Sequence, residues 1–328
     1  SSFETIVTQL VLYSQIILAS ISVAIFYLLN NNFFSKRISF YSSLLFSIVP
    51  MHLYACSQIS SISLQLFLII FFLFSFFEIT KKKNFISIIY FSITSGMLIL
   101  LRGESIAIVI LSIAYLFLFY KITFKKILLI SLISLVTTSP YLIRNILIFE
   151  KATIIKSFGY NFWRGNHPQA LKNSLVEGSE LAYGDLTEQV RNIPKDNFYR
   201  FAFDKIYLDE AIKNIKNEPL GYMILFFKKA TSFLLINYQS MDPKYFNPFN
   251  YLPLLFIGIT SLIGISLYKK KSLEYNYLLL IILAYVGIFS LVAILPRYKL
   301  IILPFQIIFT CVFFEKIKNY YLYLKKNK

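Results

Sequence analysis

The chain consists largely of apolar runs that alternate with short, mostly basic segments, and this alternation limits what it can fold into. A membrane-spanning helix needs about 20 predominantly apolar residues. The apolar share of the chain is 57%, against roughly 45 to 50% in a soluble domain, so a soluble enzyme is excluded. The pattern predicts an all-α, polytopic transmembrane helical bundle of about nine spans. These lie at 6–30, 38–56, 61–79, 84–101, 104–120, 126–147, 251–268, 275–295 and 299–316.

A tenth apolar run, at 220–237, differs because Lys228 and Lys229 interrupt it. We interpret it as an interfacial or re-entrant helix whose lysines reach the lipid headgroups. A full crossing is the alternative, and it would reverse the last three spans. The predicted organisation is six spans at 1–147, one long loop at 148–219, and the interfacial helix with three spans at 220–328.

The net charge of +17, from 33 basic and 16 acidic residues, points to a membrane rather than to nucleic acid because of where it lies. The loop at 148–219 is neutral, with ten residues of each sign. The excess flanks the apolar runs, as in cytoplasmic loops that retain lysine and arginine. We therefore expect the loop to be extracytoplasmic, in a prokaryotic inner or plasma membrane, with membrane lipids as neighbours. The clusters expected to be cytoplasmic are 36–37, 81–83, 121–126, 269–271 and 316–328.

The long loop, of 72 residues, carries two features of its own. Apolar residues at mixed three- and four-residue spacing predict an amphipathic helix at 204–217, ended by Pro219. The segment G-Y-N-F-W-R-G-N-H-P at 159–168 holds the single tryptophan. Its aromatic and amide side chains are typical of a carbohydrate-facing surface, and an aromatic anchor at the membrane interface is the alternative. The candidate substrate residues are Tyr160, Asn161, Trp163, Arg164, Asn166 and His167, the last of which is equally a plain loop residue.

Several arginines break the charge rule, because the predicted topology places them at or near the outer face. A charge at bilayer depth is costly, and a planar guanidinium suits bidentate contacts with phosphate. Together they predict a pocket for a phosphate attached to a lipid, although contacts with lipid headgroups explain each one alone equally well. These arginines are Arg102, Arg144, Arg164 and Arg297.

Segments in order along the chain resemble a known family. They are G-M-L-I-L-L-R-G-E at 96–104, P-Y-L-I-R-N at 140–145, the loop motif at 159–168, the A-x-x-x-I-x-x-x-P helix end at 211–219, and P-R-Y-K at 296–299 with P-F at 304–305. They are similar to elements of membrane glycosyltransferases of the GT-C superfamily. By pattern, the chain resembles most the group of protein O-mannosyltransferases and lipid A aminoarabinose transferases.

The resemblance implies a transferase that takes a sugar from a polyprenyl-phosphate donor at the outer face and passes it to a lipid, glycan or protein acceptor. The family's catalytic carboxylate lies in its first outer loop, which we expect upstream of Ser1 together with the first helix. Glu104 is either an ion-pair partner of Arg102 or a supporting carboxylate. The residues implied to hold the donor phosphate are Arg102, Arg144, Arg297, Tyr298 and Lys299.

Other chemistry and other functions stay open at this point. No cofactor or metal site is evident, since Cys56 and Cys311 are far apart and are interpreted as packing residues. Dependence on a divalent metal is left open. A transporter or flippase of lipid-linked or amphiphilic substrates would use the same arginines as a vestibule. A non-catalytic membrane relative is the third hypothesis.

Overall fold

The computed structural model describes residues 2–155, 157–173, 186–237, 246–268 and 272–327. Helices make up the regular structure of these residues, and no strand occurs among them. The helices are α1 (Ser2–Asn30), α2 (Lys36–Ile48), α3 (Pro50–Ser57), α4 (Ile62–Lys82), α5 (Phe85–Leu101), α6 (Ser105–Leu118), α7 (Phe124–Phe149), α8 (Phe158–Gly165), α9 (Pro168–Lys172), α10 (Thr187–Arg191), α11 (Tyr199–Asn217), α12 (Pro219–Leu234), α13 (Pro248–Leu267), α14 (Leu273–Ser290), the short 3₁₀ helix η2 (Pro296–Tyr298) and α15 (Lys299–Lys326).

The helices long and apolar enough to cross a membrane define a multi-pass membrane protein. Within the described residues there are six of them, α1, α4, α7, α13, α14 and α15, or seven if α2 and α3, bent by 50° at Val49, form one span. Helices α5 and α6 are apolar but shorter, with 17 and 14 residues. Each of the nine predicted runs therefore overlaps a helix or the bent pair, although the run at 275–295 extends beyond the end of α14 and α15 continues beyond the run at 299–316. The count of nine crossings stays a prediction.

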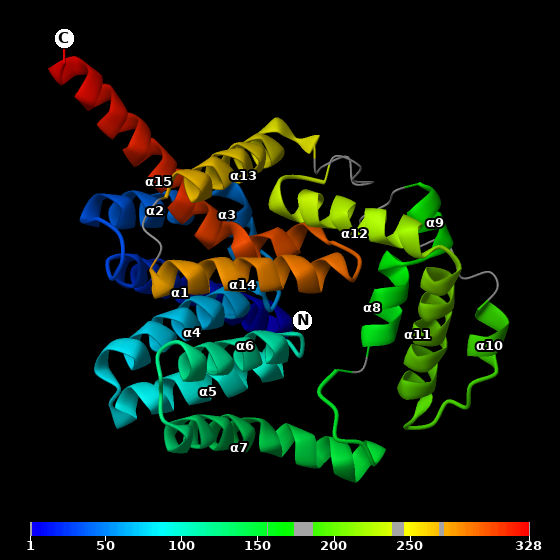
Figure 1. Ribbon diagram of the computed structural model, residues 1–328. Helices are drawn as coiled ribbons and strands as arrows, with labels where there is room; N and C mark the ends of the chain where they lie inside the picture. Colours follow the sequence, from blue (N-terminus) through cyan, green and yellow to red (C-terminus); the bar gives the residue numbers. More distant parts are fainter. Residues whose placement is uncertain (1, 156, 174–185, 238–245, 269–271, 328) are drawn as a thin grey trace. The chain divides into compact units, whose positions relative to one another are not determined.

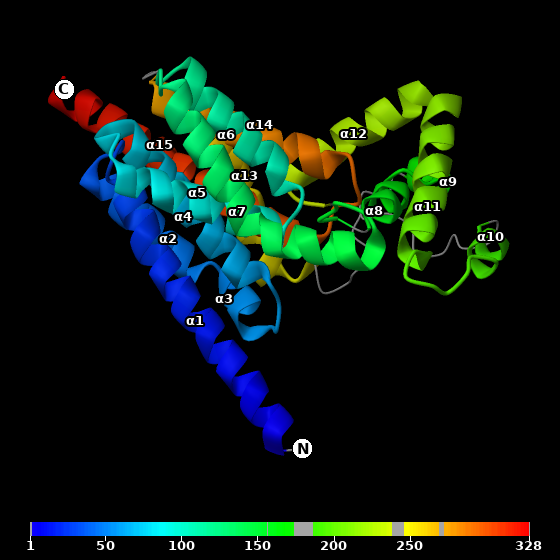
Figure 2. The same cartoon turned by 90° about the horizontal axis from the view of Figure 1, so that it is seen from below.

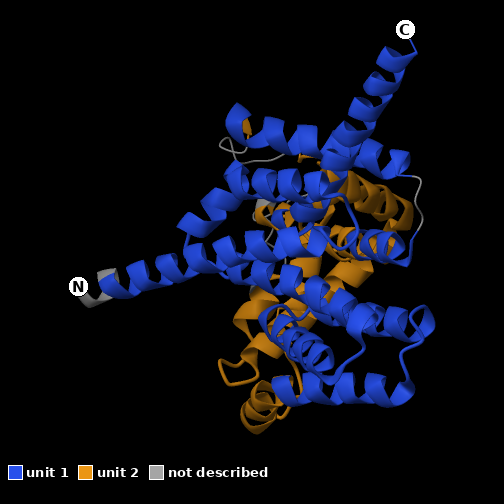
Figure 3. Ribbon diagram, turned by 90° about the vertical axis from the view of Figure 1, so that its left-hand side faces the viewer, with its two compact units in different colours: residues 1–137, 248–282, 300–328 blue, residues 138–247, 283–299 orange. Residues whose placement is uncertain are grey.

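The helices form two compact units, coloured separately in Figure 3. Unit 1 comprises residues 1–137, 248–282 and 300–328, and it contains most of the apolar helices. Unit 2 comprises residues 138–247 and 283–299, and it contains the predicted loop together with α12. The second unit therefore draws on two parts of the chain that are separated by α13 and most of α14.

Unit 1 has an aromatic core in which α4, α6 and α14 meet. The rings of Phe76 and Tyr277 stack with centroids 3.7 Å apart and planes 2° from parallel. The hydroxyl of Tyr277 lies 2.7 Å from Ser112 Oγ, so a polar group inside the core has a partner, as burial requires. Helix α4 also lies beside α1 and α5 (Figures 1 and 2).

Small residues bring neighbouring helices of unit 1 close together, as is common inside membranes. A side chain at Gly96 of α5 would collide with Thr137 of α7. One turn away, Ser134 Oγ donates to the Ser92 carbonyl (2.9 Å). Helices α13 and α15 meet in the same way at Gly264, where a Cβ would strike the backbone of Phe309.

The lysine-rich connections of unit 1 lie together at one end of its helices. Lys81 Nζ donates to Asn32 Oδ1 (2.8 Å), and Lys126 Nζ donates to the Lys83 carbonyl oxygen (2.8 Å). Ser35 Oγ donates to Glu315 of α15 (2.7 Å), which brings the lysines that follow Glu315 to the same end. The predicted cluster at 269–271 lies outside the described residues.

Arg102 lies at the opposite end of α4 and α5. Its guanidinium donates to Gln65 Oε1 (3.2 Å) and to Ser61 Oγ (3.5 Å), at the first turn of α4 and the residue before it. No ion pair with Glu104 occurs among the described contacts; an amide oxygen of α4 and the hydroxyl of the residue before it accept the arginine instead. Within unit 1, every second connection between successive helices therefore lies at the lysine-rich end. The predicted topology has the same alternation.

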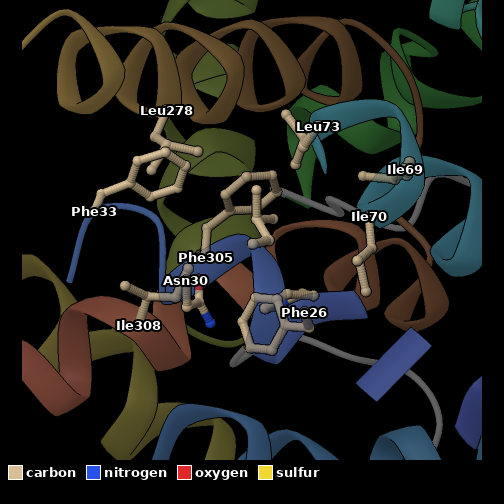
Figure 4. Close-up of a pocket in the computed structure, with 11 residues that line it drawn as sticks. Phe26, Asn30, Phe33, Ile69, Ile70, Leu73, Leu278, Phe305 and Ile308 are labelled. Carbon is tan, nitrogen blue, oxygen red and sulfur yellow. The ribbon is translucent and has the colours of Figure 1, made fainter. Parts of the chain in front are cut away.

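A small cavity inside unit 1 belongs to its core rather than to a binding site. It is lined by side chains of α1, α4, α14 and α15, including Phe26, Leu73 and Phe305 (Figure 4). Its volume is about 10 Å³, which is about the room needed by one water molecule. Asn30 contributes the polar lining, and its Nδ2 donates to Ser42 Oγ (3.0 Å). A lipid or sugar has no room there.

Candidate functional site

Helix α8, which carries most of the glycine- and aromatic-rich motif, packs lengthwise on α11 in unit 2 (Figures 1 and 2). The carboxylate of Asp204 on α11 accepts hydrogen bonds from the backbone N–H groups of Gly159 and Tyr160, both 2.9 Å long. An acidic group is favourable there because a helix N-terminus carries partial positive charge and unpaired N–H groups. Gly159 allows the close approach, since a Cβ at this position would strike the Asp204 carbonyl oxygen.

Trp163 lies inside unit 2 rather than on an exposed face. Its side chain is 2% exposed and belongs to a cluster with Leu186, Tyr207 and Ala211. The Tyr207 ring centroid lies 4.7 Å away. A sugar therefore has no access to this ring in the described structure, and the tryptophan holds α8 against α11. Ala211, the first residue of the predicted A-x-x-x-I-x-x-x-P element, is part of the same packing.

The amphipathic helix of the loop is longer than predicted. Helix α11 starts at Tyr199 rather than at residue 204 and ends at Asn217. The extra turn is held by aromatic contacts, among them Tyr199 with Phe203 at 6.0 Å between ring centroids. Pro219 occupies the first turn of the next helix, α12, where a missing N–H is tolerated.

The end of α8 meets the segment that precedes Arg297. A Cβ at Gly165 would collide with the backbone of Val292 and Ala293. The side-chain amide of Asn166 donates to the Phe162 carbonyl (2.7 Å) and to the Leu291 carbonyl (2.8 Å). Two contacts therefore hold the G-N pair of the loop motif against the segment before the P-R-Y-K element, some 125 residues later: the close approach of Gly165 and the side-chain hydrogen bond of Asn166.

Lys229 of α12 is fully buried beneath this junction. Its Nζ donates to the Gly165 carbonyl oxygen (2.5 Å) and to Asn166 Oδ1 (3.3 Å). The prediction that both lysines of α12 reach the headgroups is wrong for Lys229, because the buried Gly165 carbonyl at the end of α8 accepts a hydrogen bond from its amino group. Burial lowers the pKa of Lys229 to about 7, since desolvation disfavours the charged form. No carboxylate is paired with it.

Lys299 is buried in the same unit and joins the P-R-Y-K element to α12. Its Nζ donates to the carbonyl oxygens of Phe233 (2.9 Å), Leu234 and Leu235 (2.7 Å). These carbonyls lie at the C-terminal end of α12, where a cation is favourable. An ammonium group has three N–H donors, and all three are used. Lys299 therefore has none left for the donor phosphate, so its implied phosphate contact is replaced by a positioning role.

The Tyr298 side chain packs against other aromatic rings of unit 2. Its ring lies 4.6 Å from that of Phe289, which in turn lies 5.3 Å from Phe233 of α12. Arg297 projects differently: it is exposed, and its guanidinium carbon lies 5.7 Å from the Tyr298 ring centroid. No described carboxylate or carbonyl is bonded to it. Of the three implied phosphate ligands in this element, Arg297 is the one whose donors are available.

The remaining predicted residues have local partners or lie elsewhere. Arg144 is exposed near the end of α7, where its Nη1 donates to Asn145 Oδ1 (3.1 Å), and the described contacts do not join it to Arg297. Arg164 is half-buried on α8, one residue before the Gly165 junction. Arg102 and Glu104 belong to unit 1.

The polar side chains of the loop motif are engaged in local structure. Asn161 Nδ2 donates to the Ser157 carbonyl (2.8 Å). His167 Nδ1 accepts from the Gln169 N–H (3.0 Å) and caps α9, which agrees with its interpretation as a loop residue. Among the described residues no group of three or more His, Cys, Asp or Glu side chains is arranged to hold a metal ion.

Two residues of this site were missed in the sequence. Lys229 could have been found, because a lysine inside an apolar run is costly unless it has partners. Asp204 gives no such signal, since acidic residues are ordinary on an amphipathic helix.

In comparisons with known proteins, no protein-family model, curated protein or solved structure matches the chain.

Proposed function

We propose that the chain is a membrane glycosyltransferase of the GT-C type, which transfers a sugar from a polyprenyl-phosphate donor to a lipid, glycan or protein acceptor at the outer membrane face. The observation that carries the proposal is the junction in unit 2. Two segments that resemble family elements, 159–168 and 296–299, are brought together by Asn166, Lys229 and Lys299. Arg297, at the edge of this junction, has a free guanidinium.

The proposed mechanism assigns the phosphate to arginine. When the sugar leaves the lipid phosphate, negative charge builds on the phosphate oxygens, and preorganised cations stabilise that charge. Arg297 supplies donors in the planar arrangement that phosphate prefers, with Arg144 and Arg102 as further candidates on the same predicted face. Deprotonation of the acceptor hydroxyl needs a carboxylate as general base.

The proposed topology has nine crossings in a prokaryotic inner or plasma membrane, with residues 148–219 outside. In it, α5, α6 and the bent pair of α2 and α3 cross, whereas α12 lies at the interface. Length does not separate α12, with 16 residues, from α6, with 14. Helix α12 differs because Lys228 and Lys229 lie within it, and charged residues inside a spanning helix are costly. The common end of the lysine-rich connections in unit 1 supports the alternation of this topology.

Binding of a lipid phosphate tests the proposal without requiring turnover. The purified protein is titrated with geranylgeranyl phosphate and, as a neutral match, with geranylgeraniol. We expect the phosphate to bind more tightly and Arg297→Ala to weaken it about 10- to 100-fold, because a hydrogen bond to a charged group contributes about 1.5 to 3 kcal/mol. Arg191→Ala, which removes an exposed arginine on α10 of the same unit, is expected to bind like the wild type. Equal binding of alcohol and phosphate would refute the proposal.

A further inference from the structure

A second cavity lies in unit 1, between α2 and the part of α15 at 311–319, and it extends to the end where the lysine-rich connections gather. Its volume is about 340 Å³, which is within the range of roughly 300 to 1,000 Å³ typical of ligand pockets. It shares no residue with the junction in unit 2. It is lined by Arg37, Ile38, Tyr41, Leu44, Leu45, Ile48, Cys311, Phe314, Glu315, Lys318 and Asn319.

One end of the cavity lining is charged and the rest is apolar. Arg37 and Lys318 are cations without a hydrogen bond or an ion pair in the described structure, whereas the carboxylate of Glu315 accepts from Ser35 Oγ. The remaining wall is mostly aliphatic and aromatic, and Leu44 and Ile48 are about half exposed. A ligand that fits this lining therefore has an anionic group at one end and an apolar body.

The length of the apolar wall matches one leaflet of a bilayer. Arg37 and Ile48 are 11 residues apart on α2, which corresponds to about 16 Å along a helix axis. Half of the hydrocarbon core is about 15 Å thick. A molecule whose charged group contacts Arg37 and whose chain follows α2 would reach about the midplane of the membrane.

We propose that this cavity binds one anionic phospholipid, with its phosphate between Arg37 and Lys318 and an acyl chain along the groove between α2 and α15. Charge complementarity selects this occupant: two cations, Arg37 and Lys318, line the cavity against a single carboxylate, Glu315. Basic pockets between transmembrane helices on the cytoplasmic side bind anionic headgroups. The site is independent of the proposed transferase activity and is tested separately.

The test counts lipids retained by the purified protein in native mass spectrometry, with phosphatidylglycerol and phosphatidylcholine of identical acyl chains offered together. We expect one retained phosphatidylglycerol. In the double variant Arg37→Gln/Lys318→Gln its affinity is expected to fall about 30-fold, because each cation near an anionic headgroup contributes about a 5-fold preference. The control is Lys125→Gln/Lys325→Gln, which removes two exposed lysines of the same unit outside the cavity.

A third variant tests the groove itself. Leu44→Trp adds bulk to the apolar wall at a half-exposed position and leaves every charge in place, so it is expected to displace the lipid as well. Retention of phosphatidylglycerol by Leu44→Trp would overturn the proposal, because the lipid would then be held by its headgroup alone. Equal retention of phosphatidylcholine, or equal losses in the control and the Arg37/Lys318 variant, would also overturn it in favour of diffuse attraction to a basic surface.

Discussion

Replacing Lys229 by methionine tests whether this buried ammonium holds the junction of unit 2 together. The substitution keeps the length of the side chain and removes its charge and its N–H donors. The Gly165 carbonyl and Asn166 Oδ1 then lose the partner that they have in the structure. A buried polar group left without a partner costs about 1 to 3 kcal/mol. Removal of the cost of burying this amino group, as an ammonium or by release of its proton, offsets part of this loss.

The dependence on pH separates the two effects. The pKa of Lys229 is about 7 in the folded protein and about 10.4 in an unfolded chain. Between these values the unfolded state binds the proton and the folded state has released it, so the free energy of unfolding increases as the pH rises. The slope approaches about 1.4 kcal/mol per pH unit, so the contribution grows by about 2 to 3 kcal/mol from pH 7.5 to 9.5. In Lys229→Met this contribution is absent.

The single tryptophan provides the assay. Trp163 is buried two residues before Gly165, so its fluorescence reports unfolding at the junction. Urea unfolding in detergent is followed at pH 7.5 and 9.5 for the wild type, Lys229→Met and Lys228→Met. Lys228 is half-buried on the same helix, and its variant is expected to keep the pH dependence. The reasoning is refuted if Lys229→Met changes with pH as much as the wild type does.

Three further predictions concern the same unit and the topology. Gly165→Ala should destabilise unit 2 by at least about 1 to 3 kcal/mol, the usual effect of overpacking, since its Cβ meets the backbone of Val292 and Ala293. Urea unfolding followed by Trp163 fluorescence measures this loss. An unchanged unfolding midpoint contradicts the close approach. Asp204→Asn should cost about 0.5 to 2 kcal/mol through the weakened cap of α8, measured in the same way. A cysteine replacing Asp209 should react with an impermeant maleimide added to intact cells, whereas one replacing Lys82 should not, and the reverse result contradicts the orientation.

The apolar helices could be predicted because hydropathy alone identifies them. Every predicted run corresponds to a helix or to the bent pair of α2 and α3, since twenty apolar residues leave the chain few alternatives. Shorter features were less predictable. The start of α11 was placed five residues too late, because Tyr199 and Phe203 stabilise its first turns through ring contacts that no local pattern reveals.

The site could be predicted only in part, because its geometry depends on contacts distant in sequence. The motif at 159–168 was recognised, yet composition does not distinguish a ring that stacks on a sugar from one that packs in a core, and Trp163 packs. Lys229 finds its partner some 63 residues earlier in the chain. Lys299 uses its three donors on carbonyls at the end of α12, contacts that the pattern of residues at 296–299 does not indicate.

The measurement that tests the central claim most directly is sugar transfer by the protein in sealed vesicles. Polyprenyl-phosphate carrying a radiolabelled sugar is supplied with membranes of the source organism as acceptor, and label is followed from the lipid to the acceptor fraction. The account predicts transfer that is strongly reduced in Arg297→Ala and unchanged in Arg191→Ala. Movement of the intact labelled lipid across the bilayer without release of the sugar would contradict it, because that result identifies a lipid transporter rather than a transferase.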